Sequence, residues 1–113
     1  MSVGAQAEQL AAKFLQQNGL SLLHQNYRCR FGEIDLIMQD GPALVFVEVR
    51  LRNRTDFGGA AASIGWAKQG KLLTTARHYL STLRKIPPCR FDAVLLHASD
   101  GSQIEWVKNA FSA

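Results

Sequence analysis

The sequence predicts an α/β domain with a mixed five-stranded sheet flanked by helices. Its 113 residues are the length of one domain, and 47% of them are hydrophobic, which is enough for a core. Two segments repeat apolar residues at helical spacing, and five are extended apolar runs bounded by turn residues. The segments follow the order α-β-β-β-α-β-β, so we expect residues 1–113 to form a single domain.

The first helix is expected at residues 2–18. Ser2 is a suitable N-terminal cap, and Gly19 stands where a helix commonly ends. The face expected to meet the core consists of Ala7, Leu10, Ala11, Phe14 and Leu15. Glu8 lies one position off this face and borders it.

Three strands are expected next, at residues 20–28, 31–39 and 43–52. The turn residues Asp40 to Pro42 separate the last two strands. A turn centred between Gly41 and Pro42 pairs residues whose numbers sum to 83. That register sets Asp35 opposite Glu48 on one face of the sheet, with Cβ atoms about 4.5–5.5 Å apart.

A loop at residues 53–62 is expected to lead into a second helix that runs from about Ser63 to Leu83. Its apolar stripe comprises Leu72, Leu73, Ala76, Tyr79, Leu80 and Leu83. Trp66 and Gln69 continue the stripe toward the N-terminus.

The end of the chain is expected to add two strands to the sheet. Two consecutive prolines stop the second helix, and strands follow at residues 89–97 and 103–108, joined by a turn at 99–101.

The composition excludes several classes of protein. Two cysteines, Cys29 and Cys89, cannot build a disulfide framework or a four-cysteine zinc site. The sequence has no secretory signal and no apolar run long enough to cross a membrane, so we expect a cytoplasmic protein without a membrane partner.

Positive charge is concentrated in the middle of the chain. Residues 50–90 hold nine Lys and Arg against a single Asp, whereas the whole chain has a net charge of only +4. Such a segment suits a polyanionic partner. A solvated helix face with a charged loop explains the charge equally well, so both interpretations stay open on this ground alone.

The paired carboxylates of Asp35 and Glu48 need something that offsets their repulsion. Oxygen ligands of this kind suit Mg²⁺ or Mn²⁺, and Arg50, on the same strand face as Glu48, can reach a phosphate bound there. The alternative is a solvent-facing network of cross-strand ion pairs with the neighbouring arginines Arg28, Arg30, Arg50 and Arg52.

The segments Gly32–Ile37 and Phe46–Arg50 resemble the YraN family of small bacterial proteins. That family is similar to archaeal Holliday-junction resolvases and to the restriction-endonuclease-like, or PD-(D/E)xK, nucleases. Further matching positions follow in the expected order, at Gly4, Glu8, Asn26–Arg28, Lys68, Gln69, Ala76–Leu80 and Arg90–Asp92. The resemblance covers nearly the whole chain and implies a restriction-endonuclease-like fold.

The resemblance also implies roles for individual residues. Glu8, Asp35 and Glu48 match the positions that bind the catalytic metal or its water shell, and Gln69 matches a supporting position on the following helix. Arg50 occupies the position of the motif lysine. Because arginine does not release its proton, Arg50 cannot be a general base, although it can orient water or stabilise charge on a phosphate.

Two functions of different classes follow. One is a Mg²⁺- or Mn²⁺-dependent endonuclease acting on DNA, with branched DNA implied only by the resemblance. The other is a non-catalytic module that binds nucleic acid or a protein partner on the same fold. In both, the residues expected to grip the flanking phosphates are Arg52, Arg54, Lys68 and Lys71. The resolvase resemblance also makes a homodimer worth testing.

Two tryptophans, Trp66 and Trp106, can stack on bases, but packing in the core is the commoner use of such residues. Asp92 is either a further acidic residue of the site or the partner of Arg90 or Arg28.

Overall fold

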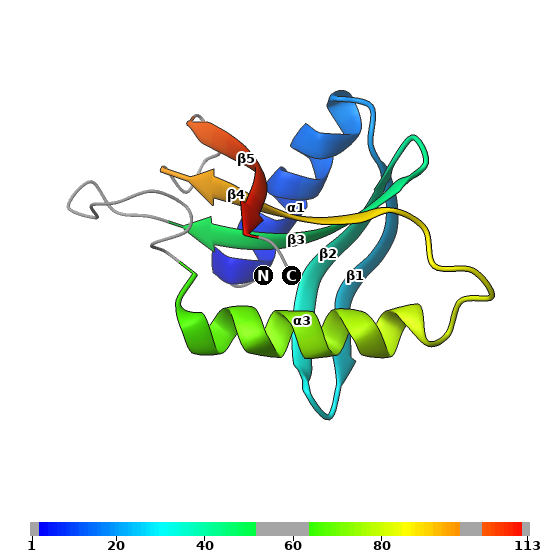
Figure 1. Ribbon diagram of the computed structural model, residues 1–113. Helices are drawn as coiled ribbons and strands as arrows, with labels where there is room; N and C mark the ends of the chain where they lie inside the picture. The colour runs from blue at the N-terminus through cyan, green and yellow to red at the C-terminus, as the bar shows by residue number, and fades with distance from the viewer. Residues whose placement is uncertain (1–2, 52–63, 98–102, 112–113) are drawn as a thin grey trace.

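The computed structural model describes residues 3–51, 64–97 and 103–111. Within these residues the helices and strands follow the predicted order (Figure 1). The helices are α1 (Val3–Gln17) and α3 (Trp66–Leu80), and the strands are β1 (Ser21–Cys29), β2 (Gly32–Asp40), β3 (Ala43–Leu51), β4 (Cys89–Leu96) and β5 (Ile104–Phe111). The loop expected at residues 53–62 and the turn expected at 99–101 lie outside the described residues.

The strands form one mixed sheet in the spatial order β1-β2-β3-β4-β5. All neighbouring strands are antiparallel except β3 and β4, which are parallel. Parallel neighbours need a long crossover between them, and α3 lies within that crossover. The predicted mixed five-stranded sheet is therefore confirmed.

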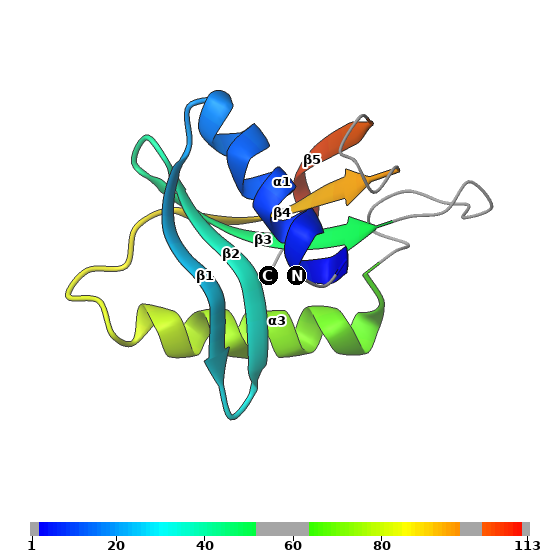
Figure 2. The same cartoon turned by 180° about the vertical axis from the view of Figure 1, so that it is seen from behind.

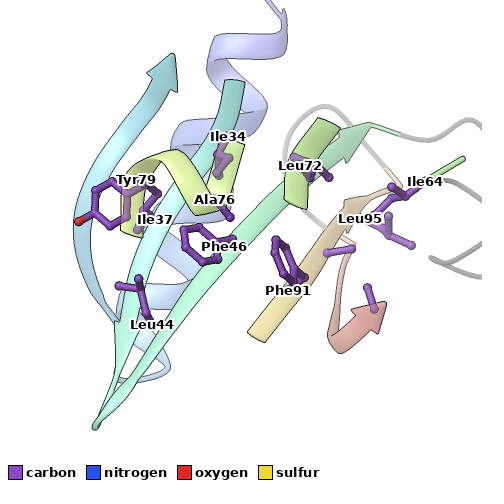
Figure 3. Close-up of a cluster of buried hydrophobic side chains, with 12 residues drawn as sticks. Ile34, Ile37, Leu44, Phe46, Ile64, Leu72, Ala76, Tyr79, Phe91 and Leu95 are labelled. Atoms are coloured by element: carbon purple, nitrogen blue, oxygen red, sulfur yellow. The ribbon is translucent and has the colours of Figure 1, made fainter. Parts of the chain in front are cut away.

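The two helices cover opposite faces of the sheet (Figures 1 and 2). Because side chains alternate between faces along a strand, each face has its own apolar core. The core under α1 includes Ala11 and Leu15, which confirms the predicted apolar face of that helix. The core under α3 centres on Phe46, whose ring stacks on Phe91 with centroids 5.3 Å apart (Figure 3).

The hairpin of β2 and β3 has the predicted register. The pairs run from Leu36 with Val47 to Asp40 with Ala43, and the numbers of each pair sum to 83. Gly41 has a φ of 57°, a left-handed conformation that glycine adopts without strain and that the tight turn requires. Asp35 and Glu48 therefore stand one step beyond the last of these pairs.

Helix α3 is shorter than predicted at both ends. It begins at Trp66 rather than near Ser63, after Gly65 in an extended conformation, and it ends at Leu80 rather than Leu83. The Ser81 and Thr82 hydroxyls donate to carbonyls three residues earlier, each at 2.6 Å, and compete with helix continuation.

The last strand is longer than predicted and continues to Phe111 instead of ending at Lys108. A shift of register occurs between the pairs of Phe91 and Ala93, and Asn109 takes a φ of 54° there. Asparagine tolerates this left-handed conformation, so the strand bends at Asn109 and resumes pairing beyond it. Across the described residues, neither helix is long and apolar enough to span a bilayer.

Candidate metal and nucleic-acid site

Asp35 of β2 and Glu48 of β3 lie together, as the register predicts. The backbone N–H of Val49 donates to Asp35 Oδ2 at 2.8 Å, so this carboxylate takes up the hydrogen bonding of β3 just beyond the last paired residues. A second hydrogen bond joins the carboxyl groups of Asp35 and Glu48 to each other. Two carboxyl groups in such contact share a proton or require a cation.

Burial makes this pair unusually basic. Glu48 is only 6% exposed, and this burial, followed by the negative charge of Asp35, raises the pKa of Glu48 to about 7. Burial also raises the pKa of Asp35. The hydrogen bond from the Val49 N–H and the positive charges of Lys68 and Arg50 lower that pKa, but burial outweighs them. The pair therefore retains a proton near neutral pH until a cation displaces it.

Two cationic side chains face Glu48. Arg50 Nε lies 3.4 Å from Glu48 Oε1, and Lys68 Nζ lies 3.8 Å from the same oxygen. Lys68 was expected to contact phosphates beside the site, but it reaches the carboxyl pair from α3. Both cationic side chains stay more than one third exposed, so each remains open to a ligand from solvent.

Glu8 approaches the pair from α1. Burial, and next the charges of Asp35 and Glu33, raise the pKa of Glu8, whereas the charge of Arg28 and a hydrogen bond from the Asn26 side chain lower it. The second oxygen, Glu8 Oε1, is buried and has no hydrogen-bond partner in the described part of the chain. A buried carboxylate oxygen without a donor is a candidate ligand for a cation or its water.

Asn26 is a member of this site that patterning alone did not single out for a role. Its neighbours Gln25 and Tyr27 pair with Leu36 and Ile34, which brings Asn26 beside Asp35. Asn26 itself has a φ of 52°, a left-handed conformation within β1. The sequence did offer one signal for Asn26: it is a polar residue, placed before the hairpin of β2 and β3, of a type that tolerates a left-handed backbone.

The other predicted site residues lie elsewhere or outside the described residues. The side-chain amide of Gln69 donates to the carbonyl of Ile64 at 2.8 Å and so stabilises the start of α3. Lys71 is exposed on α3 where the helix approaches Gly32. Arg52 and Arg54 belong to the segment that the structure does not describe.

The donor set suits a cation that keeps much of its water. In residues 3–51, 64–97 and 103–111, no three His, Cys, Asp or Glu side chains are close enough to form a complete metal cage. Mg²⁺ does not need one, because one or two carboxylates with waters and substrate phosphates commonly hold it. Asp35 and Glu48 fit that pattern, and Glu8 Oε1 fits the water shell.

Asp92 has a structural role. Its buried carboxylate accepts hydrogen bonds from Arg90 Nε, Trp106 Nε1 and the backbone N–H of Asn109, each at about 3.0 Å. Both oxygens are occupied within the sheet, so of the two interpretations of Asp92, pairing with Arg90 is confirmed.

The fold and the site define a small mixed α/β protein with a buried carboxyl pair and two cations at one sheet face. The chain belongs to the uncharacterised protein family UPF0102, whose family profile matches residues 7–96. UPF0102 is the YraN family, so the expected membership of that family is confirmed.

Several bacterial relatives resemble the chain over almost its whole length. UPF0102 proteins of Nitrosomonas eutropha and Nitrosomonas europaea are 62% and 60% identical to it over 108 residues. These alignments cover 96% of this chain and 91% and 92% of the respective relatives. A UPF0102 protein of Nitrosospira multiformis is 58% identical over 108 residues, covering 96% of this chain and 91% of the relative.

Proposed function

We propose that this protein is a metal-dependent endonuclease that acts on DNA phosphodiester bonds. The observation that carries the proposal is the buried carboxyl pair of Asp35 and Glu48, held in contact beside Arg50 and Lys68. Arg50 and Lys68 offset the burial and repulsion of this pair only in part, so a bound metal cation would stabilise it further. That cation would sit next to two groups that bind phosphate.

The proposed roles follow from the donor atoms. Asp35 and Glu48 would hold Mg²⁺ or Mn²⁺, and Glu8 would support the water shell. The metal, when bound, would supply positive charge for the phosphate and lower the pKa of a water molecule. Arg50 would orient the phosphate and stabilise its developing charge, since a guanidinium keeps its proton.

Lys68 would add a second cation at Glu48. The motif position on β3 holds Arg50 instead of lysine, and the ammonium of Lys68 stands 3.8 Å from the carboxylate of that motif. Lys71, Arg52 and Arg54 would hold the flanking backbone. We further propose a restriction-endonuclease-like fold, branched DNA as substrate and a homodimer as the assembly to test by light scattering. These three proposals rest on the resemblance of the hairpin motif to archaeal Holliday-junction resolvases.

One observation favours a second candidate function, a non-catalytic nucleic-acid-binding module. Arg50 and Lys68 already partner Glu48 without a metal, and arginine cannot take the general-base role of a lysine. A site neutralised in this way would bind phosphate and not cut it.

Cleavage assays separate these functions. Purified protein would be incubated with linear, nicked and four-way-junction DNA in Mg²⁺, Mn²⁺ or EDTA. We expect metal-dependent cleavage that Asp35→Asn and Glu48→Gln each reduce at least about 100-fold, because each removes charge needed in the transition state. Arg50→Lys should keep more activity than Arg50→Ala, since lysine preserves the positive charge.

Glu105→Gln is the matched control, because it removes the same charge as Glu48→Gln from an exposed position on β5. Cleavage that persists in EDTA, or in both site variants, would rule out the proposed centre. Salt-sensitive DNA binding without cleavage under any condition would establish the binding module instead.

A further inference from the structure

Trp66 is the most exposed large apolar side chain in the described part of the chain, at 93%. Its predicted place in the apolar stripe of the second helix is therefore wrong. The stripe begins farther along, at Leu72, and Ile64 is the buried anchor just before the helix. The indole of Trp66 is therefore open to solvent and free to contact a ligand.

The second tryptophan makes the contrast clear. Trp106 donates its Nε1 to Asp92 at 3.0 Å, meets the edge of Phe14 and has the ammonium of Lys108 over its ring at 4.5 Å. Among the described residues, no ring, cation or hydrogen-bond partner occupies Trp66. Contacts within the protein thus account for the position of Trp106, whereas the ring of Trp66 is exposed to solvent.

Glycines keep the surroundings of Trp66 open. Gly65 precedes it, and Gly70 lies one helical turn later on the same side; a Cβ added at either would meet nothing within 4 Å. The intervening Gln69 is turned back to Ile64, so its side chain is held on the helix. Among residues 64–80, a flat ligand can therefore approach the indole without displacing a neighbouring side chain.

The position of Trp66 relates it to the carboxyl site. It is the first residue of α3, and two residues later Lys68 reaches Glu48. In both views, α3 begins on the side of the molecule where β3 and β4 end (Figures 1 and 2). The first turn of α3 has no acidic residue and no side-chain cap, which leaves its surroundings positive beside Lys68 and Lys71.

We propose that Trp66 stacks on an unpaired base of the nucleic acid, while Lys68 and Lys71, on another side of the same helix, bind phosphates farther along the strand. The planar apolar ring of Trp66 complements the flat base of a nucleotide, and the lysines of the same helix complement the phosphates of the strand. In a duplex the bases stack on one another, so only a single-stranded or distorted segment offers a free base face. The inference rests on the proposed function for its ligand and makes single-stranded or locally unpaired DNA the preferred substrate.

The test measures binding in EDTA, where cleavage does not interfere. Labelled single-stranded oligothymidine and a blunt duplex of equal length would be titrated by fluorescence anisotropy. Trp66→Ala should weaken single-strand binding about 5- to 150-fold, the loss expected for one stacked base, and change duplex binding less than about twofold. Trp66→Phe should restore most of the affinity, whereas Lys68→Ala should weaken binding of both DNAs.

Binding of the single strand should also quench the tryptophan fluorescence of the parent protein. In Trp66→Ala most of this quenching should be absent. Equal losses for single strand and duplex, or no loss for either, would overturn the inference; circular dichroism confirms that the variant is folded. If the protein cleaves DNA but Trp66→Ala binds DNA as tightly as the parent, the stacking role alone would be contradicted. Binding that depends on Trp66, in a protein that cuts nothing, would contradict the nuclease proposal alone.

Discussion

At the scale of single residues, the carboxyl of Glu48 is the group whose chemistry depends most on its surroundings. It is buried beside Asp35 and faces two cations that only partly offset the effect of burial. The folded protein therefore keeps a proton on Glu48 under conditions in which the unfolded chain has lost it.

This proton makes the stability of the metal-free protein depend on pH. The pKa of Glu48 is about 7 in the folded state and 4.5 ordinarily, so the folded state binds more protons between these values. Stability then falls as the pH rises through this window. In EDTA, Glu48→Gln should match the parent near pH 4.5 and exceed it by on the order of 1–3 kcal/mol at pH 8, measured by urea unfolding.

Glu105→Gln, which changes the same charge at an exposed site, should show no such divergence with pH. A constant difference between Glu48→Gln and the parent from pH 4.5 to pH 8 would contradict the raised pKa. Adding Mg²⁺ at pH 8 should raise the thermal midpoint of the parent and leave that of Glu48→Gln nearly unchanged, because only the parent keeps both carboxylates.

At the scale of elements, the hairpin of β1 and β2 is fitted closely to α3. Cys29 pairs with Gly32 across a tight turn, and Gly32 has a φ of 148°. A Cβ at Gly32 would lie 3.1 Å from the Thr75 hydroxyl on α3, so only glycine allows the hairpin to approach the helix this closely.

Two glycine substitutions should therefore change stability in opposite directions. Gly32→Ala introduces both backbone strain and the contact with Thr75, and should lower the free energy of unfolding by about 1–3 kcal/mol. Gly70→Ala, inside α3 with open space around it, should raise that free energy by about 0.5–1 kcal/mol. Urea denaturation measures both; a stabilised Gly32→Ala variant would show that the hairpin does not need its close approach.

At the scale of the whole molecule, a polar network ties the strands of the sheet together between the two apolar cores. Asp92 on β4 binds Trp106 and Asn109 on β5, and Arg90 bridges Asp92 to Asp40 at the end of β2. One buried carboxylate thus connects three strands, and the network fixes the bend of β5 at Asn109.

Removing this carboxylate should destabilise the entire fold. Asp92→Ala leaves the Trp106 and Asn109 donors without their acceptor and deprives Arg90 of one partner, so we expect a loss on the order of 3–5 kcal/mol. Asp40→Ala, at the more exposed end of the same network, should cost about 1 kcal/mol or less. Comparable losses for the two variants in thermal unfolding would contradict a central role for Asp92.

Local patterns predicted those parts of the site that lie on one hairpin. The turn at Gly41 and the alternation of β3 determine the register, and the register brings Asp35 to Glu48. They did not predict that Lys68 reaches Glu48, because this contact depends on how α3 lies across the sheet. The true start of α3 was missed for the same reason, and with it the exposure of Trp66.

The sequence by itself determined the order of the elements, the hairpin register and the residues that form the carboxyl pair. These follow from short-range steric rules and from side-chain alternation, which act between near neighbours along the chain. Only the tertiary structure decided the protonation of Glu48, the cations that face it and the exposure of Trp66. Those properties depend on burial and on charges brought from distant segments, and packing of both helices on the sheet sets them.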